Sequence, residues 1–175
     1  AKFGTIGIRK NSQIIEITTH RSENYVSNSR KPSVEFSKVV EDDLSRRDFT
    51  VNSMAISVPD WELIDPFGGQ VDLERKVLRT PLDPEVSFSD DPLRMLRAAR
   101  FMAGYQLVPG IDLIAAVELL RDRISIVSKE RVIEELKKLL KVESPTKGLL
   151  FLEQTGLLGL VIKGYNGLVS VPELA

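Results

Sequence analysis

The chain has 175 residues, of which 42% are hydrophobic and 28% are charged, so it can build the packed core of one ordinary domain or two small ones. Its 24 basic and 25 acidic residues give a net charge of -1, which excludes a strongly basic nucleic-acid coat but not a local basic patch. The absence of cysteine excludes disulfide frameworks, thiolate zinc sites and cysteine nucleophiles, and no apolar run approaches the ~20 residues of a membrane helix.

The first part of the chain, to about residue 82, mixes strand and helix signals. The β-branched runs at 5–8 and 14–18 flank a turn-like segment and predict a hairpin. Residues 20–38 are polar and without period, which predicts a loop. Residues 41–58 pass from an acidic start to an apolar end and predict a short helix leading into a strand. The two glycines within 65–69 predict a turn.

The second part of the chain has the period of amphipathic helices. Pro92 suits the first turn of a helix that Asp91 or Ser89 caps, and Gly104 suits its end. We expect its apolar stripe to consist of Leu93, Leu96, Ala99 and Ala103.

Three more helices are predicted, over 111–121, 129–140 and 146–154. In the middle one we expect Val132, Leu136, Leu139 and Leu140 to face inward. A mixed first part followed by an all-helical second part predicts an α+β fold.

The strand that contains Glu16 offers one carboxylate beside two threonines. Divalent cations such as Mg²⁺ prefer carboxylate oxygens and take only one or two from the protein when phosphates supply the rest. The alternative is a strand residue that faces solvent, since one carboxylate does not make a metal site.

The segment from Arg46 through Arg47 and Asp48 to Asn52 concentrates groups that suit a nucleotide. Two arginines can clamp phosphates, an aspartate can accept from a ribose hydroxyl, and an asparagine can do both. The alternative is a charged helix end in which the arginines pair with Asp42 and Asp43 one turn earlier.

Asp91 and Arg94 are three residues apart, so we expect them to share one helix face. A fixed carboxylate beside a fixed guanidinium can recognise the edge of a base by hydrogen bonds. The alternative is a capping aspartate with a surface ion pair, which contributes little.

Two further stretches carry weaker signals. The glycines of 65–73 permit hinge motion, although an ordinary turn explains them as well. The stretch 121–147 has a mild excess of basic residues, which suits contact with an RNA backbone or a solvated helix face.

Together these segments resemble the successive motifs of one family, the bacterial-type (class II) tRNA nucleotidyltransferases and poly(A) polymerases. The resemblance rests on the order and spacing of the motifs and extends to about residue 160. The matching segments are Phe3-Gly4-Thr5 with Glu16–Thr19, Arg46–Ala55, Asp65–Gly69 with Asp72-Leu73, Asp90–Arg94 with Arg97–Phe101, and Ser128–Leu140 with Pro145, Gly148 and Thr155–Leu158.

The resemblance implies a role for each matching residue. Glu16 corresponds to the third carboxylate of a Mg²⁺ site, and Asp91 with Arg94 to the pair that recognises the base of CTP or ATP. Arg97, one turn further on, implies support for the triphosphate or for that pair. The motif that holds ribose and triphosphate corresponds to Arg46, Arg47, Asp48 and Asn52, and the turn that links two domains to Asp65, Gly68 and Gly69.

The resemblance also implies a domain order. We expect the later part of a polymerase-β-like catalytic head over 1–82, a helical neck over 83–142 and the start of a helical body over 143–175. The family's Asp-x-Asp motif is not in the sequence, and Asp90 stands where the family usually has glutamate. We therefore expect a fragment that does not itself catalyse nucleotide addition.

The activity implied is transfer of nucleotides from CTP and ATP to the 3′ end of tRNA, in the cytoplasm, with release of pyrophosphate. Three alternatives stay open: a poly(A) polymerase, an enzyme that adds only A or only C, and a non-catalytic module that binds RNA or nucleotides.

Overall fold

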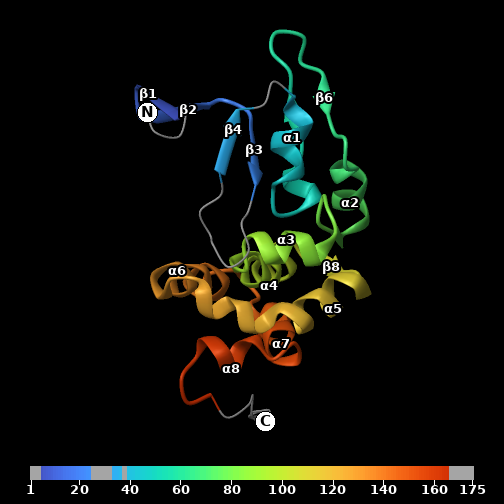
Figure 1. The fold of residues 1–175 in the computed structure, drawn as a ribbon, viewed down its shortest axis with the longest axis vertical. Helices are drawn as coiled ribbons and strands as arrows, with labels where there is room; N and C mark the ends of the chain where they lie inside the picture. Colours follow the sequence, from blue (N-terminus) through green and yellow to red (C-terminus); the bar gives the residue numbers. More distant parts are fainter. Residues whose placement is uncertain (1–4, 25–32, 37–38, 166–175) are drawn as a thin grey trace.

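The computed structural model describes residues 5–24, 33–36 and 39–165. An upper group of short strands and helices rests on a lower group of helices (Figure 1). The predicted motif at Phe3-Gly4 and the last residues of the expected body, 166–175, lie outside the described residues. Within the described part of the chain, no helix is long and apolar enough to cross a membrane.

The predicted hairpin is confirmed. Strand β1 (Thr5–Lys10) pairs antiparallel with β2 (Gln13–Thr18), and Gly7 lies opposite Glu16. The isoleucine side chains of both strands are exposed, namely Ile6, Ile8, Ile14, Ile15 and Ile17. Packing within the described part of the chain therefore does not hold this hairpin in place.

The predicted loop over 20–38 contains a second hairpin, and there the prediction is wrong. Strand β3 (Arg21–Asn24) pairs antiparallel with β4 (Ser33–Phe36), while 25–32 and 37–38 lie outside the described residues. The sequence of β3, Arg-Ser-Glu-Asn, has low strand propensity, so only pairing with β4 reveals it.

The predicted helix and strand over 41–58 are confirmed. Helix α1 (Val40–Ser45) is followed by the 3-10 helix η1 (Thr50–Asn52) and by β5 (Ala55–Ile56), which pairs with β6 (Leu63–Ile64). Phe49, before η1, is fully buried and joins this region to the main core.

The turn at 65–69 is the start of a helix that the sequence did not predict. Gly68 has φ 72° and precedes α2 (Gly69–Arg75). The carboxylate of Asp65 accepts hydrogen bonds from the backbone N–H groups of Gly69 at 2.7 Å and Gln70 at 2.9 Å, which satisfies two donors of the first turn.

Two helices follow in close succession. The unpredicted α3 (Pro84–Asp90) is capped by Asp83, whose side chain accepts from the backbone N–H of Glu85 at 2.8 Å. Helix α4 (Leu93–Tyr105) is the predicted helix, and the stripe of Leu93, Leu96, Ala99 and Ala103 is buried. It passes the predicted stop at Gly104 and ends at Tyr105, followed by Gln106 in the left-handed conformation as its C-cap.

The remaining helices are α5 (Ile111–Leu120), the 3-10 helix η2 (Arg121–Ile126), α6 (Lys129–Leu140), α7 (Thr146–Gln154) and α8 (Leu157–Val161). Three of them, α5, α6 and α7, follow the predicted ranges closely, whereas η2 and α8 were not predicted.

The second part of the chain is not all-helical, which corrects the prediction. Strand β8 (Val108–Pro109) pairs in parallel with β7 (Val77–Leu78). The backbone N–H of Val108 donates to the carbonyl of Lys76 at 2.7 Å. The predicted α+β class itself is confirmed, with helices and two-stranded sheets in the described residues.

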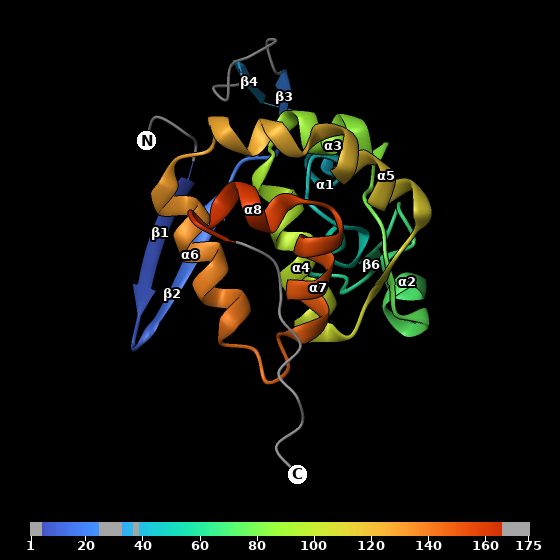
Figure 2. The same cartoon turned by 90° about the horizontal axis from the view of Figure 1, so that it is seen from below.

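Helix α4 forms the centre of the helical group, where α6 and α7 pack against it (Figure 2). A Cβ added at Gly148 of α7 would lie 2.5 Å from the carbonyl oxygen of Ala99, so glycine permits this close approach. In α6, Leu140 is exposed and Glu135 is buried, contrary to the predicted inward face. The guanidinium of Arg100 in α4 hydrogen-bonds the Glu135 carboxylate and compensates its burial.

Candidate functional site

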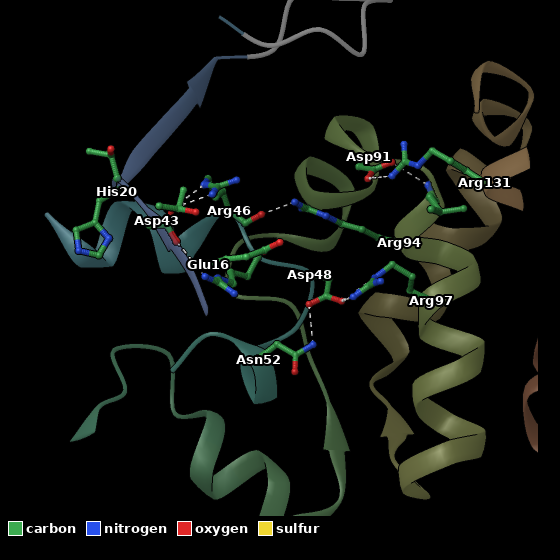
Figure 3. A pocket seen from close by; sticks show the side chains of 14 residues that line it. Glu16, His20, Asp43, Arg46, Asp48, Asn52, Asp91, Arg94, Arg97 and Arg131 are labelled. Carbon is green, nitrogen blue, oxygen red and sulfur yellow. Dashed lines mark hydrogen bonds and ion pairs between the residues drawn. The ribbon is translucent and has the colours of Figure 1, made fainter. Parts of the chain in front are cut away.

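A cavity of about 710 Å³ lies where the strands, α1 and η1 face the helical group (Figure 3). Its lining includes residues from β2, from the segment after α1, from the start of α4 and from α6. It brings together all the residues that the sequence assigned to metal or nucleotide: Glu16, Arg46, Arg47, Asp48, Asn52, Asp91, Arg94 and Arg97.

Asp43 holds the two neighbouring arginines of the cavity. Its Oδ1 accepts from Arg46 Nε at 3.2 Å and Nη2 at 2.8 Å, and its Oδ2 accepts from Arg47 Nη2 at 3.2 Å. The alternative interpretation of this segment predicted that the arginines pair with Asp42 and Asp43 at the end of the helix. In these bonds both arginines pair with Asp43. The arginines nevertheless line the cavity, so the two readings are compatible.

The ionisation of Asp43 reflects this pairing. Burial by itself would raise the pKa of its carboxyl group, but the hydrogen bonds and positive charges of Arg46 and Arg47 outweigh burial. The pKa of Asp43 is therefore held below its ordinary value of 3.8. At neutral pH the carboxylate is charged and orients both arginines.

Asp48 organises the opposite side of the same segment. Its Oδ2 accepts from Arg97 Nε at 2.8 Å and from Arg97 Nη2, and its Oδ1 accepts from Asn52 Nδ2 at 3.0 Å and from the backbone N–H of Phe49 at 2.9 Å. A carboxylate has about four acceptor positions, so these bonds occupy all the acceptor positions of Asp48. In this arrangement it orients Asn52 and Arg97 and has no acceptor left for a ribose hydroxyl.

Arg94 connects the start of α4 to the upper group. Its Nη1 donates to the hydroxyl oxygen of Ser87 at 2.8 Å and to the Ser87 carbonyl at 3.3 Å, and its Nη2 donates to the carbonyl of Arg46. The guanidinium is thereby fixed by neutral oxygens from both parts of the chain, and it lines the cavity.

Asp91 lies outside α4, which begins two residues later, so it does not share a helix face with Arg94. Its Oδ1 accepts from the backbone N–H of Leu93 at 3.3 Å, as a capping residue does, and its Oδ2 accepts from Arg131 Nη2 at 2.9 Å. The predicted capping bond is thus present, but the ion pair of Asp91 is with Arg131 and not with Arg94. Asp91 and Arg94 still face the same cavity (Figure 3).

The turn at 65–69, called here the glycine turn, packs tightly against the segment 46–52, called here the nucleotide segment. Thr50 donates from its hydroxyl to Asp72 Oδ2 at 2.6 Å, and Arg79 Nε donates to the same oxygen at 3.1 Å. A Cβ added at Gly69 would lie 2.1 Å from the carbonyl oxygen of Thr50. Asp65, Gly68 and Gly69 do not line the cavity, and their hinge role stays a prediction.

Several cavity residues were not among the predicted site residues. Arg131 appeared only as one of the basic residues of 121–147, and Asp43 only as a helix-end partner. His20 and Thr18 also line the cavity, at the end of β2 and just after it. Their spacing to the other motifs carries no periodic signal, so only the folded arrangement reveals them.

The lining carries one more positive than negative charge, and its guanidinium groups suit phosphate oxygens. Five arginines and four carboxylates face the cavity, and three of those carboxylates pair with arginines: Asp43 with Arg46 and Arg47, Asp48 with Arg97, and Asp91 with Arg131. Guanidinium groups held in this way can bind phosphate oxygens bidentately with little further loss of side-chain entropy.

Metal binding has less support. Glu16 lines the cavity, but the described residues contain no group of three or more histidine, aspartate or glutamate side chains placed to hold a metal ion. Glu16 therefore supplies one oxygen ligand of the kind Mg²⁺ prefers, and not a complete site.

Two family models match consecutive parts of the chain. Residues 1–79 match the poly A polymerase head domain, and residues 111–167 match a probable RNA and SrmB-binding site of polymerase A. The chain belongs to the CCA-adding enzyme and poly(A) polymerase family. The head-domain match includes the cavity residues from Glu16 to Asn52, and the second match includes Arg131, whereas Asp91, Arg94 and Arg97 lie between the two matches.

Curated relatives agree with the family models. The CCA-adding enzyme of Bacillus subtilis is 41% identical over 159 residues, covering 89% of this chain and 39% of the relative. The CCA-adding enzyme of Geobacillus stearothermophilus is 36% identical over 160 residues, covering 90% of this chain and 39% of the relative. This member of the family thus spans about two fifths of the length of these relatives.

Solved structures of the family share the fold. A crystal structure of the Bacillus stearothermophilus CCA-adding enzyme in complex with CTP superimposes with a TM-score of 0.80 at 33% identity, over 89% of this chain and 37% of that one. A tRNA nucleotidyltransferase complexed with a primer tRNA and an incoming ATP analog gives a TM-score of 0.75 at 32% identity, over 95% of this chain and 46% of that one.

Proposed function

We propose that the protein carrying this chain transfers nucleotides from CTP and ATP to the 3′ end of tRNA, and that this chain forms the pocket that selects the nucleotide. In that reaction the oxygen of the RNA 3′-hydroxyl attacks the α-phosphorus. The bond between the α-phosphorus and the bridging oxygen breaks, pyrophosphate leaves and the hydroxyl proton is released. Positioning and electrostatic stabilisation supply most of the catalysis in such a transfer.

The observation that carries the proposal is the convergence of three separated motifs on one cavity. Glu16, the segment that begins at Arg46 and the pair Asp91 and Arg94 are far apart in sequence but line the same space. Relatives at 36–41% identity are CCA-adding enzymes, and a related structure contains CTP. Both findings support a nucleotide as the ligand.

The contacts inside the cavity support a division of roles. Arg46, Arg47 and Arg97 present cationic groups held by Asp43 and Asp48, which suits the triphosphate. Asn52, held by Asp48, is placed to bind the ribose. Asp48 itself acts as a positioning residue in this scheme, since its acceptor positions are filled.

Asp91 and Arg94 are the groups we assign to the base. A carboxylate accepts from an exocyclic amino group, while a guanidinium donates to ring nitrogens or carbonyl oxygens. Cytosine and adenine both carry an amino group where uracil and guanine carry a carbonyl. A fixed acceptor beside a fixed donor therefore favours CTP and ATP over UTP and GTP.

Mg²⁺, which this family generally uses, would neutralise phosphate charge when bound, and Glu16 would contribute one ligand. The described residues do not complete such a site, so we derive no step through the metal.

The test is equilibrium binding of the four nucleoside triphosphates to the 175-residue chain, measured by calorimetry. We expect CTP and ATP to bind more tightly than UTP and GTP. Arg94→Ala should lower that preference by about tenfold, since one bidentate contact contributes ~1–3 kcal/mol of base discrimination. Lys137→Ala, on an exposed face of α6, is the matched control. Equal binding of all four triphosphates to the unaltered chain would contradict the proposal.

Poly(A) synthesis is the second candidate, because the head-domain model that matches residues 1–79 takes its name from poly A polymerase. The length of the product separates the two. A protein that carries this chain and adds three nucleotides to a tRNA lacking its terminal CCA is a CCA-adding enzyme, whereas a long run of A identifies a poly(A) polymerase.

The division into a head over 1–82, a neck over 83–142 and a body from 143, and a cytoplasmic location, are further proposals. The first rests on the resemblance and on the head-domain match, which ends at residue 79.

A further inference from the structure

The guanidinium of Arg94 is oriented by side-chain contacts that Asp91 does not share. The backbone N–H of Arg94 donates to the carbonyl of Asp91 at 3.0 Å, which joins the two backbones. The side chains have different partners: Asp91 pairs with Arg131, and Arg94 donates to Ser87 and to the carbonyl of Arg46. The orientation of the guanidinium beside Asp91 therefore depends on these partners, of which Ser87 also contacts the backbone of Asp91.

Ser87 contacts Asp91 and Arg94 at once. Its carbonyl oxygen accepts from the backbone N–H of Asp91 at 3.3 Å and from Arg94 Nη1 at 3.3 Å. Its hydroxyl oxygen accepts from the same Nη1 at 2.8 Å, the shortest of the three contacts. The hydroxyl thus fixes the rotation of the guanidinium relative to the backbone that ends at Asp91.

The helix that carries Ser87 is itself well anchored. Asp83 accepts from the backbone N–H of Glu85 at 2.8 Å, and Pro84 occupies the first turn. Phe88, next to Ser87, is fully buried in the main core. Ser87 is only 2% exposed and does not line the cavity, so it cannot reach a nucleotide and acts from behind the site.

The contacts of Arg94 leave it donors for a base. A guanidinium has five N–H donors, and the hydrogen bonds to Ser87 and to the carbonyl of Arg46 use three of them. The remaining two belong to a group whose rotation is already restricted. A donor pair with restricted rotation discriminates between bases better than a pair that can rotate to match different base edges.

We propose that Ser87 is a positioning residue for base selection, which holds Arg94 in the orientation that distinguishes CTP and ATP from UTP and GTP. This inference rests on the proposed function of the cavity. Ser87 acts through its hydroxyl oxygen as an acceptor, and it contributes nothing to the binding of the triphosphate itself.

Binding measurements on the 175-residue chain test this role. Ser87→Ala removes the hydroxyl with little change of volume. We expect the preference for CTP over UTP to fall by about three- to tenfold, which is less than the full loss of a hydrogen bond from a charged donor because the Ser87 carbonyl still accepts from Arg94 Nη1. The affinity for inorganic tripolyphosphate, which has no base, should stay unchanged.

Two further variants separate positioning from packing. Ser87→Thr keeps the hydroxyl and should keep the CTP preference. Ser89→Ala removes a hydroxyl from the same helix. The bond that Ser89 accepts from Arg123 uses its backbone carbonyl, which alanine retains, so this variant should behave like the unaltered chain. Thermal unfolding of each variant shows whether the fold is retained.

The outcomes separate the two proposals. If Arg94→Ala lowers the CTP preference but Ser87→Ala does not, the inference about Ser87 is wrong while the proposed function stands. If Ser87→Ala lowers CTP and tripolyphosphate affinity equally, Ser87 supports the site in general and the positioning role is also wrong. If the unaltered chain has no preference among the four triphosphates, the proposed function fails first.

Discussion

Asp48 and Arg97 lie 49 residues apart in the chain and meet in a part-buried ion pair in which two guanidinium nitrogens share one carboxylate oxygen. The other carboxylate oxygen holds Asn52 and the backbone of Phe49. A single side chain therefore sets the positions of three neighbours, and through Arg97 it joins the nucleotide segment to α4.

Replacing Asp48 with asparagine should affect ligand binding and stability together. Asp48→Asn keeps the size of the side chain but removes its charge and places an amide donor against Arg97 or Asn52. We expect the free energy of unfolding to fall by about 1.5–3 kcal/mol, the range for a lost hydrogen bond to a charged group, and CTP affinity to fall with it. Urea unfolding and calorimetry measure the two effects. Asp60→Asn, in an exposed loop, is the control, and equal behaviour of the two variants would contradict this organising role.

The lowered pKa of Asp43 predicts how stability depends on pH. Because this pKa lies below 3.8 in the folded chain, the contribution of Asp43 is fully present above the pKa of the unfolded chain. It is lost as the pH falls through the lowered folded value, since the unfolded chain takes up the proton first. Unfolding free energies measured at decreasing pH should therefore converge for the unaltered chain and Asp43→Asn. Parallel curves would show that Arg46 and Arg47 do not stabilise the charged form.

Gly69→Ala should destabilise the chain because the added Cβ meets the backbone of Thr50. The distance of 2.1 Å to the Thr50 carbonyl oxygen cannot be relieved by a side-chain rotation. We expect a loss of about 1–3 kcal/mol from overpacking, measured by chemical denaturation. Gly7→Ala is the matched control, since a Cβ there has no heavy atom within 4 Å. If both alanines cost the same, the contact between the glycine turn and the nucleotide segment is not tight.

Glu135→Ala should be among the most damaging changes on α6. The carboxylate is 2% exposed and bonds Arg100, whose guanidinium also lies over the ring of Phe101 at 4.7 Å. Removing one member of a buried pair leaves the other uncompensated, at a cost of about 3–5 kcal/mol. Glu134→Ala removes the same chemical group from the exposed neighbouring position and should change little. Thermal unfolding of the two variants gives the comparison.

The sequence predicted the helices better than the short strands. The ranges of α5, α6 and α7 follow from a local apolar period, and each bound agrees to within one residue. Strands β3 and β8 form through partners elsewhere in the chain, β4 and β7, so no local pattern indicates them. Helix α3 was missed because it has only two turns, too few to show a period.

The candidate site was predicted as a set of residues but not as a set of contacts. The motifs that line the cavity were named from residue type and from their resemblance to a family. Pairings such as Asp91 with Arg131 and Asp48 with Arg97 join residues 40 and 49 positions apart, and only the fold brings them together. The same reason explains the inward Glu135, whose partner Arg100 lies 35 residues earlier.

The parallel pairing of β7 with β8 has a consequence for local opening. The two strands meet at Val77 and Val108, so the intervening chain, which carries Asp91 and Arg94, is a loop closed at its base. Helices α3 and α4 within this loop are also held by α5, α6 and α7 and by the bond of Arg97 to Asp48, so the strand pair is one of several attachments of the loop. The amide hydrogen of Val108, which donates to the carbonyl of Lys76, should report in hydrogen exchange when the base of the loop opens.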